Sequence, residues 1–217
     1  MVYRWYFKRS IEYDNKERNL EWKDVRPVIN VVNHKDFLNL INELLSDSNT
    51  VLDVGCGVGE TLEKISCPIK IGVDAHRPYL ENARASEKFL KLNYRAERLR
   101  ELFLPKSIDS VTMIDVIEHF EKEDALDVLN QVEEIATKRV VIFTPRGFFR
   151  QLDIDHYNLG GESFQRHRSG WEVEDFEKLG YNTVIFSKFH DQSNKAFLEV
   201  YGKNATPVDA LLAWKDC

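Results

Sequence analysis

From about residue 36 onward, the chain alternates between segments with helical spacing of apolar residues and short, β-branched apolar runs. In residues 36–45 the apolar side chains recur every three to four positions, which indicates an amphipathic helix. The run TVLDVG (50–55) is short, apolar and ends in glycine, which is typical of a buried parallel strand. Four further runs predict strands, at 69–75, 89–95, 108–116 and 139–145, and the segments between them predict helices at 60–66, 77–88 and 123–137.

This alternation of strands and helices indicates a series of βαβ units. Such units build a parallel sheet with helices on both faces, because each crossover returns the chain across one face of the sheet. The hydrophobic pattern therefore predicts an α/β fold.

The pattern changes in residues 146–170, which are polar and contain several glycines. A loop of this length in a compact domain is usually functional or disordered. The segment 173–180 then predicts a short helix that ends at Gly180. The runs 182–189 and 196–204 predict a closing β-hairpin. We expect a last helix in VDALLAW (208–214), with Thr206 as its cap and Pro207 as its first residue.

Residues 1–33 show neither helical nor strand periodicity. They contain the aromatic residues Trp5, Tyr6, Phe7 and Trp22, which are more than a free tail would carry. We predict an N-terminal extension that packs on the core or covers a cleft, followed by one domain at 34–217.

Composition narrows the function classes. The chain has 217 residues, 43% of them hydrophobic, and is thus long and apolar enough to fold as one domain. No apolar run approaches the roughly 20 residues that span a bilayer, and no secretory signal is evident. A net charge of −6 argues against a dedicated nucleic-acid partner. Three cysteines without a CxxC pair favour a reduced, cytoplasmic protein.

The clearest chemical signal is VLDVGCGVGETL, in which Gly55, Gly57 and Gly59 follow a predicted strand and precede a predicted helix. Glycines at such a position let a ligand approach the main chain closely. Asp74 ends the next strand, 19 residues after Gly55, and we expect it at an exposed strand tip. An acid at this spacing accepts hydrogen bonds from ribose hydroxyls. The pattern therefore predicts a nucleoside-containing ligand at the carboxyl ends of the strands.

The same residues weigh against phosphate-rich ligands. The dinucleotide fingerprint G-x-G-x-x-G requires a glycine where this chain has Glu60, whose charge would repel a pyrophosphate. No G-K-[ST] follows the glycines, which excludes a P-loop. Asp53 adds a further negative charge near the loop. These features suit a ligand with a positive charge, such as an ammonium or a sulfonium.

Four segments in residues 49–147 resemble the class I S-adenosylmethionine-dependent methyltransferases, and the type 11 branch most of all. VLDVGCGVGETL resembles motif I of that family, IGVDAHRPYLENAR the segment after it, SIDSVTMIDVIEHF the fourth-strand motif and VVIFTPRG the fifth strand. The resemblance implies a Rossmann-like, doubly wound sheet of seven strands in the order 3-2-1-4-5-7-6, with strand 7 antiparallel. It also implies S-adenosylmethionine as cofactor and S-adenosylhomocysteine as product.

The resemblance assigns cofactor contacts to residues that follow the predicted strands. Asp74 would hold the ribose diol, with Ala75 beside the adenine. Glu97 falls where the family has the adenine-contacting aspartate of a Gly-Asp pair, so this chain departs from the pattern with Ala96-Glu97. The residues expected around the methionine part and along the fourth strand are Asp53, Gly55, Cys56, Gly57, Gly59, Asp115 and Val116.

The acceptor side has two candidate catalytic residues, His119 and His167. Methyl transfer is an in-line displacement whose rate comes largely from alignment. A base matters where the acceptor is a poor nucleophile. His119 follows the fourth strand and is either such a base or a histidine that packs against the cofactor.

His167 lies in SFQRHRSGW, which is similar to a Q-x-H-x-S-G-W segment of methyltransferases in glycan pathways. By that resemblance Gln165, His167, Ser169 and Trp171 would face the acceptor. The alternative is a loop that Trp171 ties to the core. We assign no metal, because the D-x-D-H run at 153–156 is typical of a polar surface loop.

The sequence thus predicts methyl transfer to a small-molecule or glycan-precursor acceptor. Two rivals remain at this stage. One is a non-catalytic protein on the same fold that binds S-adenosylmethionine or a partner, which fold alone does not exclude. The other is an NAD(P)-dependent oxidoreductase, which Glu60 disfavours.

Overall fold

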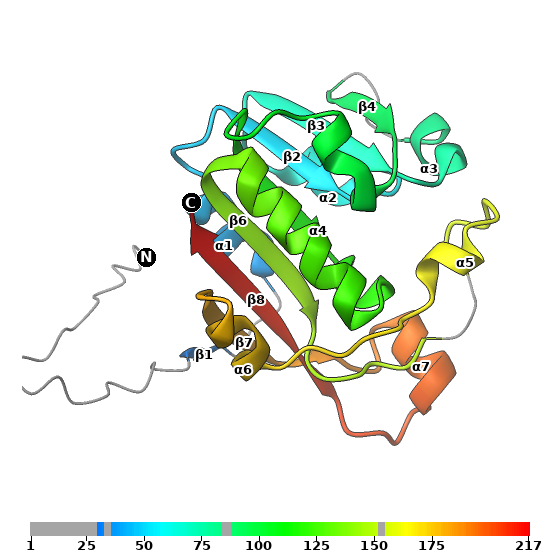
Figure 1. The fold of residues 1–217 in the computed structure, drawn as a ribbon. Helices are drawn as coiled ribbons and strands as arrows, with labels where there is room; N and C mark the ends of the chain where they lie inside the picture. Colours follow the sequence, from blue (N-terminus) through cyan, green and yellow to red (C-terminus); the bar gives the residue numbers. More distant parts are fainter. Residues whose placement is uncertain (1–29, 33–35, 84–87, 152–154) are drawn as a thin grey trace, which may run out of the picture.

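A single eight-stranded sheet runs through the molecule, with the strand order β1-β7-β8-β6-β5-β2-β3-β4 (Figure 1). The computed structural model describes residues 30–32, 36–83, 88–151 and 155–217. The strands are β1 (Asn30–Val32), β2 (Thr50–Val54), β3 (Ile69–Asp74), β4 (Leu90–Asn93), β5 (Ile108–Ile114), β6 (Ala136–Pro145), β7 (Asn182–His190) and β8 (Val208–Asp216). The helices are α1 (Phe37–Leu44), α2 (Glu60–Lys64), α3 (Arg77–Glu81), α4 (Lys122–Ile135), α5 (Glu162–Gln165), α6 (Val173–Lys178) and α7 (Lys195–Tyr201), with 3-10 turns η1 (Ala96–Glu101) and η2 (Ile117–His119).

The strand order agrees with the predicted topology. Counting β2 as the first strand and β8 as the seventh, the order from the β4 edge is 3-2-1-4-5-7-6. The strand β8 pairs antiparallel with both β6 and β7, whereas the other pairs are parallel. The predicted α/β class and sheet order are therefore confirmed. The difference is β1, which adds an eighth strand parallel to β7 at the edge.

Two apolar layers cover the sheet, because successive side chains of each strand point to opposite faces. In β6, Val140 and Ile142 pack with α4, α6 and η1 on one face, whereas Val141 and Phe143 pack with α1 and α2 on the other. All four side chains are fully buried. In Figure 1 the helix α4 lies across the front of β6. The carboxyl ends of the parallel strands are thus the edge left for a ligand.

The predictions for the last third of the chain were partly wrong. The predicted hairpin strand at 196–204 lies largely in α7, and VDALLAW, predicted as a helix, lies in β8. The Asn194 side chain caps α7 by accepting a hydrogen bond from the Phe197 backbone N–H, at 3.1 Å. Residues 210–213 are fully buried between β6 and β7, so burial in the sheet outweighs their helix propensity.

The N-terminal prediction falls largely outside the described residues. Of residues 1–33, only the strand β1 is described, and it joins the sheet beside β7. The aromatic segment 1–29, which we expected to cover a cleft, is not among the described residues. The helix α3 ends at Glu81 rather than at residue 88, and residues 84–87 are also not described. Within the described part of the chain, no helix has the length and apolarity that a membrane span requires.

The capping of α7 gives a direct test of this part of the fold. We expect Asn194→Ala to lower the free energy of unfolding by about 1 kcal/mol, because the variant loses the side-chain cap. The matched control is Thr206→Ala: Thr206 precedes β8 rather than a helix and is exposed, so its loss should change stability by less than about 0.5 kcal/mol. Urea unfolding of both variants measures the two changes, and the reverse ranking would contradict the observed assignment.

Candidate active site

A cavity of about 970 Å³ opens at the carboxyl ends of the parallel strands. This volume lies at the upper end of the range for ligand pockets, roughly 300–1,000 Å³. Its walls come from the glycine loop, the ends of β3 and β5, the segment 146–170 and the start of α7. Eleven of the twelve predicted site residues line it: Asp53, Gly55, Cys56, Gly57, Asp74, Ala75, Glu97, Asp115, Val116, His119 and His167.

The glycine loop is shaped by close packing and by positive φ angles. A Cβ atom added to Gly55, at φ +72°, would lie 2.5 Å from the Val116 side chain, so glycine lets the end of β5 approach the loop. A Cβ atom added to Gly57, at φ +55°, would have one atom within 4 Å, on Tyr157 at 3.9 Å, and Gly57 lines the cavity. Gly59 begins α2 and packs against Phe89 instead of lining the cavity.

Asp74 connects the glycine loop to the end of β3. Its Oδ2 accepts the Gly57 backbone N–H at 2.9 Å, and its Oδ1 accepts the His76 backbone N–H at 2.7 Å. The side chain is therefore 9% exposed, not at the exposed strand tip that we predicted. Burial raises the pKa of this carboxyl. Because a carboxylate oxygen has more than one acceptor site, both oxygens keep the capacity to bind a ligand hydroxyl.

Two further carboxylates lie along β2 and after β5. Asp53 is 3% exposed and accepts a hydrogen bond from Thr112 Oγ1 at 2.6 Å; burial raises its pKa to about 7. Asp115 has φ +52°, an unfavourable value for a non-glycine residue. Asp115 lines the cavity, and desolvation by the surrounding protein raises the pKa of its carboxyl group. A cationic ligand at this end of the cavity would favour the ionised form of both carboxyl groups.

Three further residues of the cofactor prediction, Ala75, Glu97 and Cys56, also line the cavity. The Ala75 carbonyl accepts a hydrogen bond from the Asn93 side chain at 3.0 Å. The half-exposed Glu97 forms an ion pair with Arg95 at 2.6 Å. Burial raises the pKa of the Cys56 thiol, so this cysteine is protonated at neutral pH and is not an activated nucleophile.

His119 and His167 lie side by side in the cavity wall, with ring centroids 4.9 Å apart and ring planes at 71° to each other. His119 Nδ1 lies 3.2 Å from the Arg166 carbonyl, and His167 Nδ1 lies 2.6 Å from the Phe149 carbonyl. A carbonyl only accepts, so each ring donates from Nδ1 and keeps a lone pair on Nε2. Burial lowers the pKa of His119 to about 4 and that of His167 to about 3. Both imidazoles are therefore neutral at pH 7.

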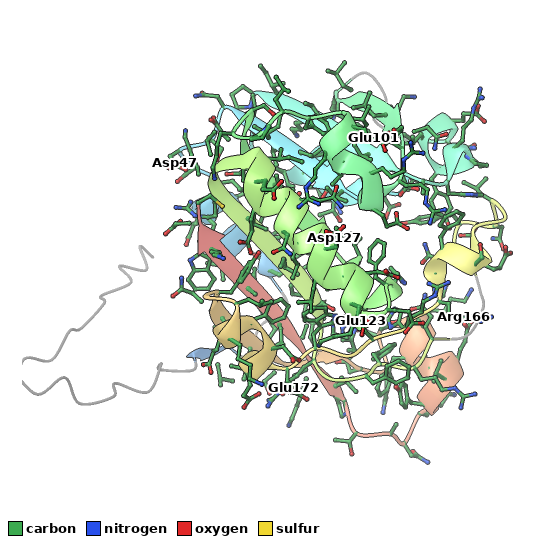
Figure 2. All side chains as sticks on the ribbon, in the orientation of Figure 1. Asp47, Glu101, Glu123, Asp127, Arg166 and Glu172 are labelled. Carbon is green, nitrogen blue, oxygen red and sulfur yellow. The ribbon has the colours of Figure 1, made fainter. Side chains whose placement is uncertain are left out.

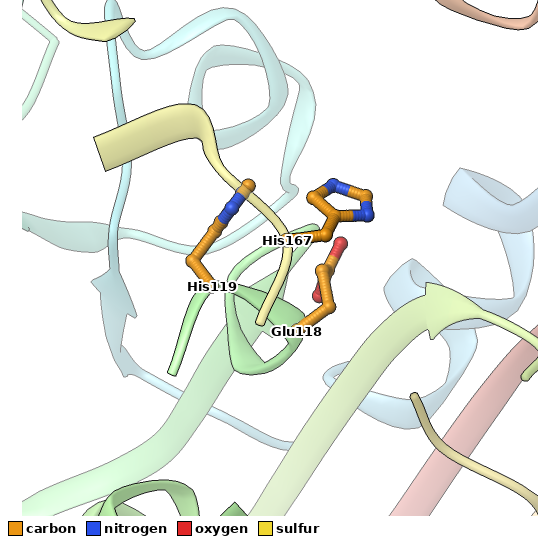
Figure 3. Close-up of side chains that lie close together, drawn as sticks. All are labelled: Glu118, His119 and His167. Carbon is orange, nitrogen blue, oxygen red and sulfur yellow. The ribbon is translucent and has the colours of Figure 1, made fainter. Parts of the chain in front are cut away.

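Sequence reasoning missed Glu118, whose carboxylate has an oxygen within 4.8 Å of a ring nitrogen of each histidine and lies beside the His167 ring in Figure 3. Its side chain is 2% exposed, and its Oε2 accepts a hydrogen bond from Thr144 Oγ1 at 2.9 Å. Its backbone carbonyl accepts the N–H groups of Arg168 and Ser169, at 2.8 and 3.1 Å. The only signal in the sequence was its place directly before His119.

The segment 146–170 forms the other wall, but not with all the residues that we predicted. Gln165 and His167 line the cavity, whereas Ser169 and Trp171 do not. Trp171 is fully buried, stacks on Phe176 at 5.2 Å between ring centroids, and donates from Nε1 to Ser169 Oγ. Trp171 thus ties the loop to the core, as the alternative had it, whereas Gln165 and His167 remain candidates for the acceptor face.

Asp155 stabilises the conformation of the same segment. It is 3% exposed, not on the surface as we predicted for residues 153–156, and it accepts hydrogen bonds from the Tyr79 hydroxyl at 2.8 Å and the Gly161 backbone N–H at 3.1 Å. His156 is exposed and lines the cavity. Asp153 is outside the described residues.

Comparisons with known proteins agree with this arrangement. Residues 51–139 match the family model described as a methyltransferase domain. The fold is similar to the YcgJ protein of Bacillus subtilis (15% identity, 84% of this chain and 98% of that chain, TM-score 0.57). It is also similar to a SAM-dependent methyltransferase of Archaeoglobus fulgidus (20% identity, 82% of this chain and 94% of that chain, TM-score 0.50). A third similar structure is magnesium protoporphyrin IX methyltransferase of Synechocystis with bound SAM (14% identity, 83% of this chain and 78% of that chain, TM-score 0.53).

No curated protein matches the chain by sequence. The matched domain model supports the predicted methyltransferase family, and the solved structures share the fold.

Proposed function

We propose that this class I S-adenosylmethionine-dependent methyltransferase transfers the methyl group of its cofactor to a small-molecule or glycan-precursor acceptor. One observation carries the proposal: the glycine loop and Asp74 line the same cavity as His119 and His167. A cofactor held at the loop would thus present its methyl group toward a wall that contains two neutral imidazoles. The cavity is large enough for both reactants to meet inside it.

The cofactor side of the proposal follows from charge and hydrogen-bonding capacity. Asp74 would accept the ribose hydroxyls while it keeps its bonds to the Gly57 and His76 N–H groups. Asp53 and Asp115 would face the positive charges of the methionine part, because desolvated carboxylates gain most from a cationic neighbour. Glu97, at the rim with Arg95, would lie beside the adenine.

The acceptor side would be formed by His119, His167 and Gln165. During transfer the bond from the methyl carbon to the sulfonium sulfur breaks as the bond to the acceptor atom forms, and the cofactor leaves as neutral S-adenosylhomocysteine. An acceptor hydroxyl must also lose its proton, and the Nε2 lone pairs of the two histidines are available to it. Bases with such low pKa values are weak, so alignment of the reactants would supply most of the rate.

The ribose contact is tested by the substitution Asp74→Asn. We expect cofactor affinity to fall by about 1–3 kcal/mol, the scale of losing hydrogen bonds to a charged group. The matched control is Asp109→Asn, since Asp109 also accepts a backbone N–H, from Asn49 at 2.7 Å, but does not line the cavity. Calorimetric titration with S-adenosylhomocysteine measures both variants. Equal affinity for the two would show that the ribose lies elsewhere.

Methyl transfer itself is tested with tritiated S-adenosylmethionine and a panel of monosaccharides, nucleotide sugars and phenols. We expect label to enter at least one hydroxyl-bearing compound. On that acceptor, His119→Ala should lower turnover by about 10²-fold, the lower end of what a positioned base contributes, while affinity for S-adenosylhomocysteine is retained. Substitution of the exposed cavity residue His156 by alanine serves as the control and should leave turnover within a few-fold. Tight cofactor binding without transfer to any member of a broad panel would favour the non-catalytic rival.

A further inference from the structure

Three side chains with metal-binding atoms converge on the acceptor side of the cavity. Glu118, His119 and His167 each offer one ligand atom, and these three atoms all lie within 4.8 Å of one another. Figure 3 shows the Glu118 carboxylate and the two imidazoles gathered around one point, where η2 meets the segment that carries His167. All three side chains also line the cavity, so a ligand held there would be accessible to an acceptor.

A second, independent observation concerns one oxygen of the Glu118 carboxylate, which lacks a hydrogen-bond partner among the described residues. Its Oε2 is bound to Thr144, but its Oε1 has no hydrogen-bond partner among the described residues. The side chain is 2% exposed. A buried carboxylate oxygen without a partner is costly, because it has lost water and gained nothing in exchange. A cation bound at this oxygen would remove that cost.

The two imidazoles are already held in the form that ligates metals. Each donates its Nδ1 proton to a backbone carbonyl, His119 to Arg166 and His167 to Phe149. Metal-binding histidines usually make this second hydrogen bond, which fixes the tautomer and the ring orientation. With Nδ1 donating, each ring keeps its Nε2 lone pair for a metal ion, and Glu118 offers a carboxylate oxygen. The guanidinium of Arg168, the residue after His167, donates to the carbonyls of His119 and Ser163.

We propose that Glu118, His119 and His167 form a binding site for a divalent transition-metal ion. Two imidazoles and one carboxylate favour borderline ions such as Zn²⁺, Fe²⁺ or Co²⁺ over Mg²⁺ and Ca²⁺, which prefer oxygen ligands. Three protein ligands leave coordination positions open toward the cavity, as at catalytic zinc sites.

The site would have a direct use if the proposed methyl transfer is correct, and this part of the inference rests on that function. An acceptor hydroxyl bound at an open position would lose its proton to solvent more readily, because the ion stabilises the alkoxide. The alkoxide oxygen then forms the bond to the methyl carbon as the carbon–sulfur bond breaks. In that case His119 and His167 would act by holding the ion, and the acceptor proton would leave to solvent instead of to their Nε2 atoms.

The test is a metal titration of the purified protein after removal of metals with a chelator. Calorimetry with Zn²⁺, and visible absorption with Co²⁺, should show one ion bound per chain, with weaker binding of Mg²⁺. Glu118→Gln, His119→Ala and His167→Ala should each lower Co²⁺ affinity at least about tenfold, since even loss of an outer-shell partner costs 10- to 100-fold. His156→Ala is the matched control, because His156 lines the same cavity outside the cluster, and it should bind Co²⁺ as the unaltered protein does.

The same samples are titrated with S-adenosylhomocysteine, which reports folding and the cofactor site. No uptake of Zn²⁺ or Co²⁺ by the unaltered protein would overturn the proposed metal site. Preference for Mg²⁺, or equal Co²⁺ affinity in all the variants, would overturn it as well. If S-adenosylhomocysteine binding is intact in those cases, the proposed methyl transfer is not contradicted. Failure of the unaltered protein to bind S-adenosylhomocysteine would refute the proposed function, whatever the metal titration gives.

Discussion

The hydrogen bonds from the Gly57 and His76 backbone N–H groups to the Asp74 carboxylate join the glycine loop to the end of β3. The shape of the cavity depends on this connection. With the loop held there, Gly55 lets Val116 approach so closely that a methyl group would not fit between them. The ends of three strands are thereby brought to one point. The same carboxylate that fixes the loop is the one proposed to bind the ribose, so stability of the loop and affinity for the cofactor are linked.

The opposite wall of the cavity depends on contacts made by the backbone around Glu118. The Glu118 carbonyl accepts two N–H groups from the segment that carries His167, and Lys122 Nζ donates to the Gly170 carbonyl at 2.8 Å. Trp171 anchors that segment in the core, with the Lys122 ammonium 3.6 Å from its ring centroid. The two histidines are therefore held by rigid packing rather than by an isolated loop. Such pre-organisation is what an alignment-based reaction requires.

Sequence patterns predicted the parts of the fold in which local and tertiary preferences agree. The strands β2, β5 and β6 are apolar, β-branched runs that the sheet largely buries, and the glycine motif marked the cavity correctly. The β8 prediction failed because residues such as Ala210 and Leu211 favour helices locally, but lie in the middle of the sheet. The α7 segment was predicted as a strand, but the Asn194 side chain caps it as a helix. The importance of Glu118 was not predictable from spacing, since its unpartnered oxygen exists only once the chain is folded.

The central claim is that the cavity binds an adenosyl sulfonium cofactor rather than a dinucleotide. Glu60 lines the cavity at the first turn of α2, where a pyrophosphate would have to lie in a dinucleotide-binding fold. Calorimetric titration of the purified chain with S-adenosylhomocysteine and, separately, with NADH tests this claim directly. The account predicts binding of S-adenosylhomocysteine and at least about tenfold weaker binding of NADH, a difference of about 1.4 kcal/mol or more. Binding of NADH with no response to S-adenosylhomocysteine or S-adenosylmethionine would contradict it.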